Sequence, residues 1–171
     1  SGLLWEVGPY LNQFPNLSQA DAKVLENISI DGKIYGVYRA QDKSRVGISY
    51  RKDWLDNLGL EKPQTIEDFY EMLHAFTYND PDGNGKDDTY GMVVSKFPGT
   101  FDVIQTWFGV PNQWDEQDGK LIPAHETPEY KESLDFLRKL YEEGLINPDF
   151  AIMNPANWLD PIVNGEAGVI V

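Results

Sequence analysis

The sequence of 171 residues contains no cysteine. Disulfide bonds, catalysis by a thiolate and metal sites with cysteine ligands are therefore excluded for this chain. Only two histidines are present, His74 and His125, so a metal site with three histidine ligands is excluded too. Neither histidine accompanies a serine or cysteine pattern typical of a nucleophilic enzyme. The lack of cysteine does not assign a compartment, because extracellular proteins need not contain disulfides.

Basic residues are scarce: 14 Lys and Arg stand against 28 Asp and Glu, which gives a formal net charge of −14. Such a surface repels nucleic acid phosphates and anionic lipid headgroups, and no basic stripe offsets the repulsion. No apolar run reaches the length of a membrane-spanning helix, and no segment resembles a signal peptide. We therefore expect no nucleic acid partner and no direct membrane contact by these residues.

What is present suffices for a folded domain. The apolar fraction of 41% argues against disorder, and the length allows a sizeable core. The aromatic share is 13%. Aromatic rings most often build cores, but they also form platforms on which sugar rings stack.

The most informative segment is residues 80–88, which read Asp-Pro-Asp-Gly-Asn-Gly-Lys-Asp-Asp. Oxygen-bearing side chains fall at alternate positions, and Gly85 takes the sixth position, where a calcium loop turns sharply. Position twelve is Gly91 instead of Glu, so water or another acid, such as Asp87, would complete the ligand shell. The predicted calcium ligands are the side chains of Asp80, Asp82, Asn84 and Asp88 and the backbone carbonyl of Lys86.

The alternative interpretation of this segment is a solvated acidic turn, since Asp, Asn, Gly and Pro are ordinary turn residues. Composition fits both interpretations, whereas the alternation over nine residues with glycine at the sixth favours calcium. The loop leads from a predicted helix (66–77) into a predicted strand (90–94), not into a second helix. We therefore expect a structural ion that ties down a loop, not a calcium sensor.

Helical periodicity, capping residues and glycine stops predict alternating helices and strands, hence an α/β fold with a small mixed sheet. Capping boxes are expected to begin helices at Ser18 and Thr65, and Gly109 and Gly144 are expected to end the helices over 101–108 and 128–143. The apolar face of the helix over 66–77 is expected to contain Phe69, Met72, Leu73 and Phe76. The turn signal Asp118-Gly119 predicts a hairpin. The apolar stripe of the last long helix is expected to contain Tyr130, Leu134, Leu137 and Tyr141. Helices are predicted from Ser18 to about Asn27, over 51–58, 66–77, 101–108 and 128–143, and from Asn154 to near Gly165. Strands are predicted over 34–38, 46–50, 90–94, 113–117 and 120–124, and after Gly165.

Both ends of the sequence suggest a piece of a longer protein. The start lacks Met, and the last residues, 167–171, read as a buried strand that stops abruptly. An exposed hydrophobic strand is an unfavourable natural terminus. Missing targeting signals are therefore given little weight.

Five segments together resemble the extracellular solute-binding proteins of ABC sugar importers, in the branch of large lipid-anchored proteins of Gram-positive bacteria. Each segment alone is weakly specific, but they occur in the correct order from about residue 30 to 171. They are 31–36 (DGKIYG), 50–60 (YRKDWLDNLGL), 63–69 (PQTIEDF), 80–89 (DPDGNGKDDT) and 164–168 (NGEAG). The family's usual proline after the first segment is absent, and Asp68 stands at its Glu position.

The resemblance implies the periplasmic-binding-protein fold of the second type. Residues 1–45 would be a remnant of the first lobe and hinge, and residues 46–171 most of the second lobe; we expect them to form one compact unit. The resemblance also implies capture of a carbohydrate outside the cell and delivery to an ABC permease. In the full-length protein a lipid anchor, absent from this chain, would provide the attachment to the cell surface.

The resemblance further directs attention to aromatic and planar polar side chains. The sugar-binding candidates are Trp114, Trp158, Trp107, Tyr35 and Arg39. Trp114 follows a loop, where binding residues often lie. Trp107 lies on an apolar helix face, so packing is the competing interpretation, and Trp158 fits either role. Trp54, beside Leu55 and Leu58, is expected to pack in the core.

The sequence thus predicts a non-catalytic carbohydrate-binding transport component with structural calcium as its only cofactor. Among 28 acidic residues some carboxylate pair always exists, so acid pairs do not indicate a glycosidase. Two alternatives stay open: a calcium-stabilised domain of an extracellular carbohydrate-active enzyme, and an adhesion module held together by calcium.

Overall fold

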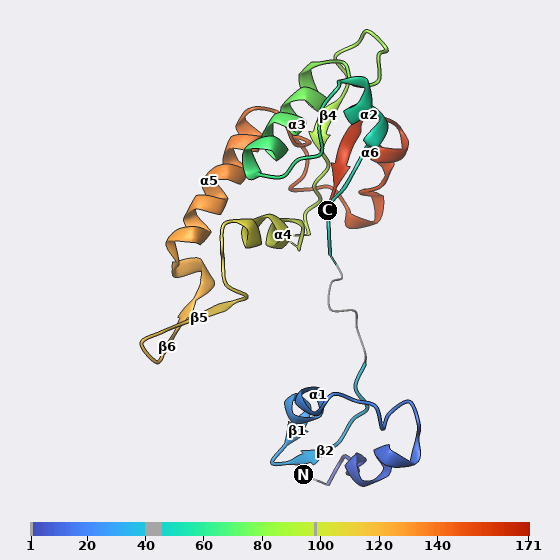
Figure 1. Cartoon of the computed structure of the whole chain (residues 1–171), viewed down its shortest axis with the longest axis vertical. Coiled ribbons are helices and arrows are strands. Elements are labelled where there is room, and N and C mark those ends of the chain that lie inside the picture. The colour runs from blue at the N-terminus through green and yellow to red at the C-terminus, as the bar shows by residue number, and fades with distance from the viewer. Residues whose placement is uncertain (1, 40–45, 98) are drawn as a thin grey trace. The chain divides into compact units, whose positions relative to one another are not determined.

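The computed structural model describes residues 2–39, 46–97 and 99–171. Contacts within the chain divide it into two compact units, Ser1–Arg45 and Val46–Val171, here called the small unit and the large unit. The sequence led us to expect a single unit, with a boundary between lobes at the same position. The membership of each unit in a lobe stays a prediction, and the units are described separately (Figure 1).

The small unit has few buried side chains, Leu11 alone among its described residues. It contains the 3₁₀ helix η1 (Gly8–Gln13), the helix α1 (Ala22–Asn27) and the paired strands β1 (Ser29–Ile30) and β2 (Lys33–Ile34). The predicted capping by Ser18 is wrong: the Asp21 carboxylate accepts the Lys23 N–H and caps α1. The predicted strand over 34–38 is also shorter, because regular pairing ends at Ile34.

The large unit is built on a three-stranded mixed sheet. Its strands are β3 (Ser49–Tyr50), β4 (Tyr90–Met92) and β7 (Ala167–Ile170), in the order β3-β7-β4. The strand β7 pairs antiparallel with β3 and parallel with β4. All three elements were predicted as strands, with longer bounds, and the mixed α/β class is confirmed.

The helix α3 (Ile66–Tyr78) packs against this sheet (Figure 1). Its start is the predicted capping box: Thr65 Oγ1 accepts the Asp68 N–H, and the Asp68 carboxylate accepts the Thr65 N–H. The apolar face predicted for it is buried in full: Phe69, Met72, Leu73 and Phe76. Trp54, on the short helix α2 (Lys52–Asn57), is fully buried in the same core, as expected.

The remaining helices of the large unit are α4 (Gly99–Trp107), α5 (Pro128–Glu142) and the short α6 (Asp160–Val163). The residues Gly109 and Gly144, predicted to end two helices, have φ of 85° and 67°, which favours glycine. The hairpin of β5 (Trp114–Gln117) and β6 (Lys120–Pro123) extends beyond the first turn of α5, away from the sheet (Figure 1). The 3₁₀ helix η2 (Ala124–Glu126) joins β6 to α5.

Two predictions for the helices were partly wrong. The helix predicted from Asn154 to near Gly165 is broken into the 3₁₀ helix η3 (Pro155–Asn157) and α6. On α5, Leu134 and Tyr141 are exposed, whereas Ser133, Leu137 and Leu140 are buried. The buried stripe is thus rotated from the one predicted, because α5 faces α4 and the core with Leu137 and Leu140. In the part of the chain that is described, no helix has the length and apolar character for a membrane crossing.

Candidate functional site

The acidic loop between α3 and β4 folds around one side chain, Asn84. The Asn84 Nδ2 donates to Asp82 Oδ2 at 2.8 Å and to Asp88 Oδ1 at 3.2 Å. The Asn84 N–H donates to Asp80 Oδ1, and the Gly85 N–H to Asp80 Oδ2, both at 3.0 Å. Three carboxylates of the predicted ligand set therefore accept hydrogen bonds from Asn84, those of Asp82 and Asp88 from its side-chain amide and that of Asp80 from its backbone N–H.

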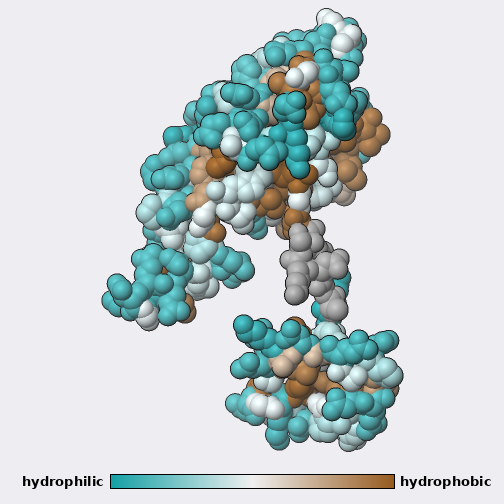
Figure 2. Space-filling view, in the orientation of Figure 1, coloured by the Kyte–Doolittle hydropathy of each residue, from teal (hydrophilic) through white to brown (hydrophobic). Residues whose placement is uncertain are grey.

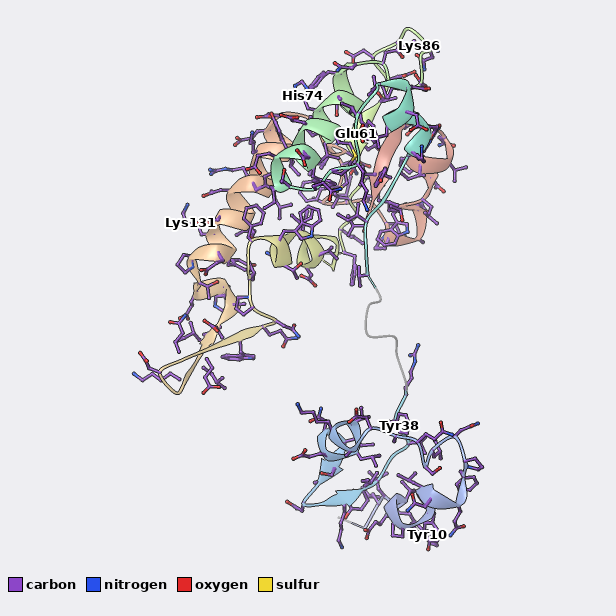
Figure 3. The ribbon with its side chains drawn as sticks, viewed as in Figure 1. Tyr10, Tyr38, Glu61, His74, Lys86 and Lys131 are labelled. Carbon is purple, nitrogen blue, oxygen red and sulfur yellow. The ribbon has the colours of Figure 1, made fainter. Side chains whose placement is uncertain are left out.

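The backbone of this loop turns sharply where the sequence predicts. Gly83 and Gly85 have φ of 69° and 75°, and Asp80 has φ of 47°. Lys86 lies at the outer end of the loop (Figure 3), and its N–H donates to Asn84 Oδ1. Among the described residues, no three acidic or histidine side chains form a group that holds a metal ion as they stand. The loop offers hard oxygen donors, which suit calcium. In the structure, the Asn84 amide donates hydrogen bonds to these oxygens.

A first cavity of the large unit, of about 480 Å³, adjoins the N-terminal end of α3. Its lining is mainly apolar and includes Trp107, whose ring meets Phe69 edge-on with centroids 5.0 Å apart. Trp107 is 38% exposed, so it both packs and contributes to a cavity wall. The other lining residues are Ile48, Tyr50, Lys62, Pro63, Gln64, Thr65, Ile66 and Phe69.

A second cavity, of about 400 Å³, lies between α4, the loop before the hairpin and the start of α5; we call it the hairpin cleft. Its lining is Asp102, Gln105, Thr106, Val110, Pro111, Asn112, Gln113, Ala124 and Tyr130. Gln113 adopts a φ of 69°, which is uncommon for a residue with a side chain. Its carbonyl accepts the Ala124 N–H at 2.8 Å, which fixes the loop against the base of the hairpin.

The five sugar-binding candidates do not form one cluster in the described structure. Trp114 begins β5 and is 55% exposed, directly after the hairpin cleft residue Gln113. Trp158 is half-buried at the end of η3, and no ring contact among described residues joins it to Trp107 or Trp114. Tyr35 is half-buried and Arg39 exposed, and both belong to the small unit.

The sequence reasoning missed most of the residues that line the two cavities. On α4, the spacing of Asp102, Gln105 and Thr106 places three polar side chains on one helix face, a signal that a helical projection would have revealed. The contribution of Tyr130, by contrast, depends on how α5 meets the hairpin. No local pattern encodes that arrangement.

Among the described residues of the large unit, the groups with shifted pKa values do not line either cavity. Burial, followed by the nearby carboxylates of Glu166 and Asp149, raises the pKa of Tyr90 well above its usual range. The backbone N–H of Gln64 lowers the pKa of Asp68, and Gln64 also lines the first cavity. These two shifts follow from burial and helix capping, and the others come from side-chain hydrogen bonds such as that between Arg51 and Asp53.

Comparison with known proteins identifies the family to which the chain is related. A family model described as bacterial extracellular solute-binding protein matches residues 1–171. Lipoprotein LipO of Bacillus subtilis is 55% identical over 176 residues, and the polygalacturonan/rhamnogalacturonan-binding protein YtcQ of the same organism is 40% identical over 173 residues. Both alignments cover 100% of this chain and 35% of the relative, so the chain spans about a third of their length.

Solved structures agree in fold. An extracellular solute-binding protein from Bifidobacterium longum subsp. infantis superposes with a TM-score of 0.78 at 26% identity, covering 99% of this chain and 39% of that one. The substrate-binding protein FusA of Streptococcus pneumoniae, as an EF-hand mutant in complex with fructo-nystose, gives a TM-score of 0.67 at 26% identity. That match covers 98% of this chain and 38% of FusA.

Proposed function

The chain belongs to the bacterial extracellular solute-binding protein family, and we propose that it is part of the carbohydrate-binding component of an ABC importer. The observation that carries this proposal is the family match over residues 1–171, together with relatives named for polygalacturonan and fructo-oligosaccharide binding. The full-length protein would capture an oligosaccharide outside the cell and deliver it to a permease without chemical change. A lipid anchor outside these residues would hold it at the cell surface, consistent with the name of the relative LipO.

The large unit offers chemistry suited to sugars. Exposed Trp114 and half-buried Trp158 present aromatic surface, and Trp107 forms part of a cavity wall. Ligand sites in proteins are concave and largely apolar, with a few polar groups that fix orientation. In the small unit, the planar guanidinium of Arg39 and the phenol of Tyr35 are groups that can hydrogen-bond to sugar hydroxyls.

The test is a thermal shift assay of the full-length protein against a panel of neutral and acidic oligosaccharides. A ligand that binds the native state alone raises the melting temperature by mass action. We expect at least one oligosaccharide to raise the melting temperature. We also expect that oligosaccharide to be chemically unchanged after prolonged incubation with the protein. No shift across the panel would contradict the proposal, and hydrolysis abolished by a single Asp or Glu substitution would favour a carbohydrate-active enzyme.

We also propose that the loop at residues 80–88 binds calcium as a structural ion. Supporting observations are the alternating oxygen donors, the convergence of three carboxylates on Asn84, and the sharp turns at Gly83 and Gly85. The related FusA, with an EF-hand that was mutated, is consistent with such a loop. A calcium ion would compete with the Asn84 amide for the carboxylates. It would join the end of α3 to the start of β4, so its role would be stability.

A further inference from the structure

We propose that the hairpin cleft is a subsite for one uncharged sugar unit of the ligand and that it excludes uronates. This inference rests on the proposed function, because it names the kind of sugar that the carbohydrate-binding protein accepts. The cleft volume of about 400 Å³ lies within the range of small-molecule sites, roughly 300–1,000 Å³.

The polar groups of the cleft suit sugar hydroxyls. Gln105, Asn112 and Gln113 together offer amide donors and acceptors, and Tyr130 adds a hydroxyl. Hydrogen bonds between described residues in this region use the side chains of Thr106, Gln117 and Thr127. None of those bonds engages the side-chain amides of Gln105, Asn112 or Gln113, so these amides are available to a ligand.

The backbone holds this polar surface in place. The φ of 69° at Gln113 is retained although it is unfavourable for a residue with a Cβ, and the bond from Ala124 to its carbonyl fixes it. Trp114 follows Gln113 directly in the chain and is 55% exposed, so the residue next in sequence to the cleft lining carries an exposed apolar ring. Amide groups in the lining and an exposed ring on the next residue are the two kinds of group that suit a pyranose or furanose, with its polar edge and less polar faces.

The charge around the cleft decides the class of sugar. Asp102 is the charged residue in the lining, which includes no lysine or arginine. Residues 101–130 contain six acidic residues and one lysine, Lys120. Lys131, next along α5 (Figure 3), is paired with Asp135. The surface of the hairpin is predominantly hydrophilic (Figure 2). A uronate carboxylate would meet like charge without a cation, which disfavours binding.

The experiment is isothermal titration calorimetry on the full-length protein, with kestose and maltotriose as neutral probes and trigalacturonate as the acidic probe. We expect a neutral trisaccharide to bind and trigalacturonate to bind at least about tenfold more weakly. Gln105→Ala and Asn112→Ala should each weaken the neutral probe by about three- to tenfold, as expected for loss of one neutral hydrogen bond. Gln117→Ala, an exposed glutamine on β5 outside the lining, is the matched control.

A charge-reversal pair tests the exclusion of uronates directly. Asp102→Lys should raise the affinity for trigalacturonate by about tenfold, while Glu116→Lys, with the same charge change on β5, should not. Melting curves of each variant establish that it is folded. Neutral binding that is insensitive to both Gln105→Ala and Asn112→Ala would overturn the subsite and leave the proposed function intact. Equal affinity for trigalacturonate and the neutral probes would overturn the exclusion, and no saccharide binding at all would contradict both proposals.

Discussion

The ring of Phe76 on α3 lies against Gly168 in β7 so closely that a Cβ at position 168 would be 2.2 Å from Phe76 Cδ2. The same Cβ would be 2.8 Å from Trp54 Cε3. Two fully buried rings, in edge-on contact with centroids 5.4 Å apart, thus occupy the space above this strand. The glycine in the family-like segment 164–168 therefore has a packing reason: only a residue without a side chain lets α3 approach the sheet this closely.

The first prediction is that Gly168→Ala destabilises the large unit by about 1–3 kcal/mol, the usual cost of overpacking a core. The clash involves ring carbons of fully buried side chains, which have little room to move. The free energy of unfolding in urea, followed by circular dichroism, measures the effect.

Gly47→Ala is the control for that substitution. A Cβ at Gly47 would meet no atom within 4 Å, so the free energy of unfolding should change by less than about 0.5 kcal/mol. Equal effects of the two substitutions would show that the close contact at Gly168 does not limit packing.

The second prediction concerns the capping box of α3 and acid. The Asp68 carboxylate accepts the N–H groups of Gln64 and Thr65 at 2.9 and 3.0 Å, and the bond from Gln64 is the main cause that lowers its pKa below 3.8. A carboxyl whose pKa is lower in the folded state stabilises the fold above its unfolded pKa. That stabilisation is lost as the pH falls through the folded pKa. Asp68→Ala should therefore lower the melting temperature at neutral pH.

The difference in melting temperature between Asp68→Ala and the parent protein should shrink as the pH falls below 3.8. Glu67→Ala, an exposed acid in the same turn, is the control and should show a smaller effect at neutral pH. A difference that stays constant from neutral to acidic pH would contradict the assigned role of the carboxylate.

The sequence predicted best the features that are local. Thr65 and Asp68, three residues apart, specify the start of a helix, and Gly109 and Gly144 specify the ends of two amphipathic helices. These signals depend on backbone chemistry alone, and the structure has them where predicted. The family could also be identified from the sequence, because its segments are short and follow one another in order along the chain. These features need no knowledge of how the elements pack.

The sequence predicted less well the features that depend on packing. Leu134 and Tyr141 fit a helical stripe, yet they are exposed, because α5 presents Leu140 to the core together with the predicted Leu137. Likewise, Gln105 and Tyr130 come together in one cleft only through the placement of α4 against α5 and the hairpin. An aromatic residue attracts attention in a sequence, whereas a glutamine or asparagine becomes a candidate only once its neighbours in space are known.

The third prediction is that calcium raises the melting temperature of the protein and that a chelator lowers it again. An ion that binds only the native state adds about 2.7 kcal/mol at a hundredfold excess over its Kd. Asp82→Ala should abolish the calcium dependence, because Asp82 is one of the three carboxylates that converge on Asn84. Differential scanning calorimetry with and without added calcium measures both effects.

The control for the loop is Glu116→Ala, which removes an exposed acid from β5 and should leave the calcium dependence unchanged. If chelation leaves the melting curve of the parent protein unaltered, the loop is a solvated acidic turn. In that case the hydrogen bonds from Asn84 to Asp82 and Asp88 are sufficient to hold it.

The fourth prediction separates packing from binding at two tryptophans. Trp107→Ala removes an edge-on contact with Phe69, which is 4% exposed, and should lower the free energy of unfolding by about 1–2 kcal/mol through lost ring contact and burial. Trp114→Ala removes a ring that is 55% exposed and should change stability by less than about 0.5 kcal/mol.

For saccharide binding by the full-length protein we expect the reverse order, with the larger effect from Trp114→Ala. Trp114→Ala should weaken the neutral trisaccharide by about tenfold, since loss of an aromatic contact of about 1.4 kcal/mol changes an equilibrium constant by that factor. Trp107→Ala should change the affinity less, because the Trp107 ring is partly engaged by Phe69. Urea unfolding and calorimetric titration of the same samples provide the two measurements. If Trp107→Ala abolishes binding while Trp114→Ala leaves it unchanged, the ligand lies in the cavity beside α3 and not beside the hairpin.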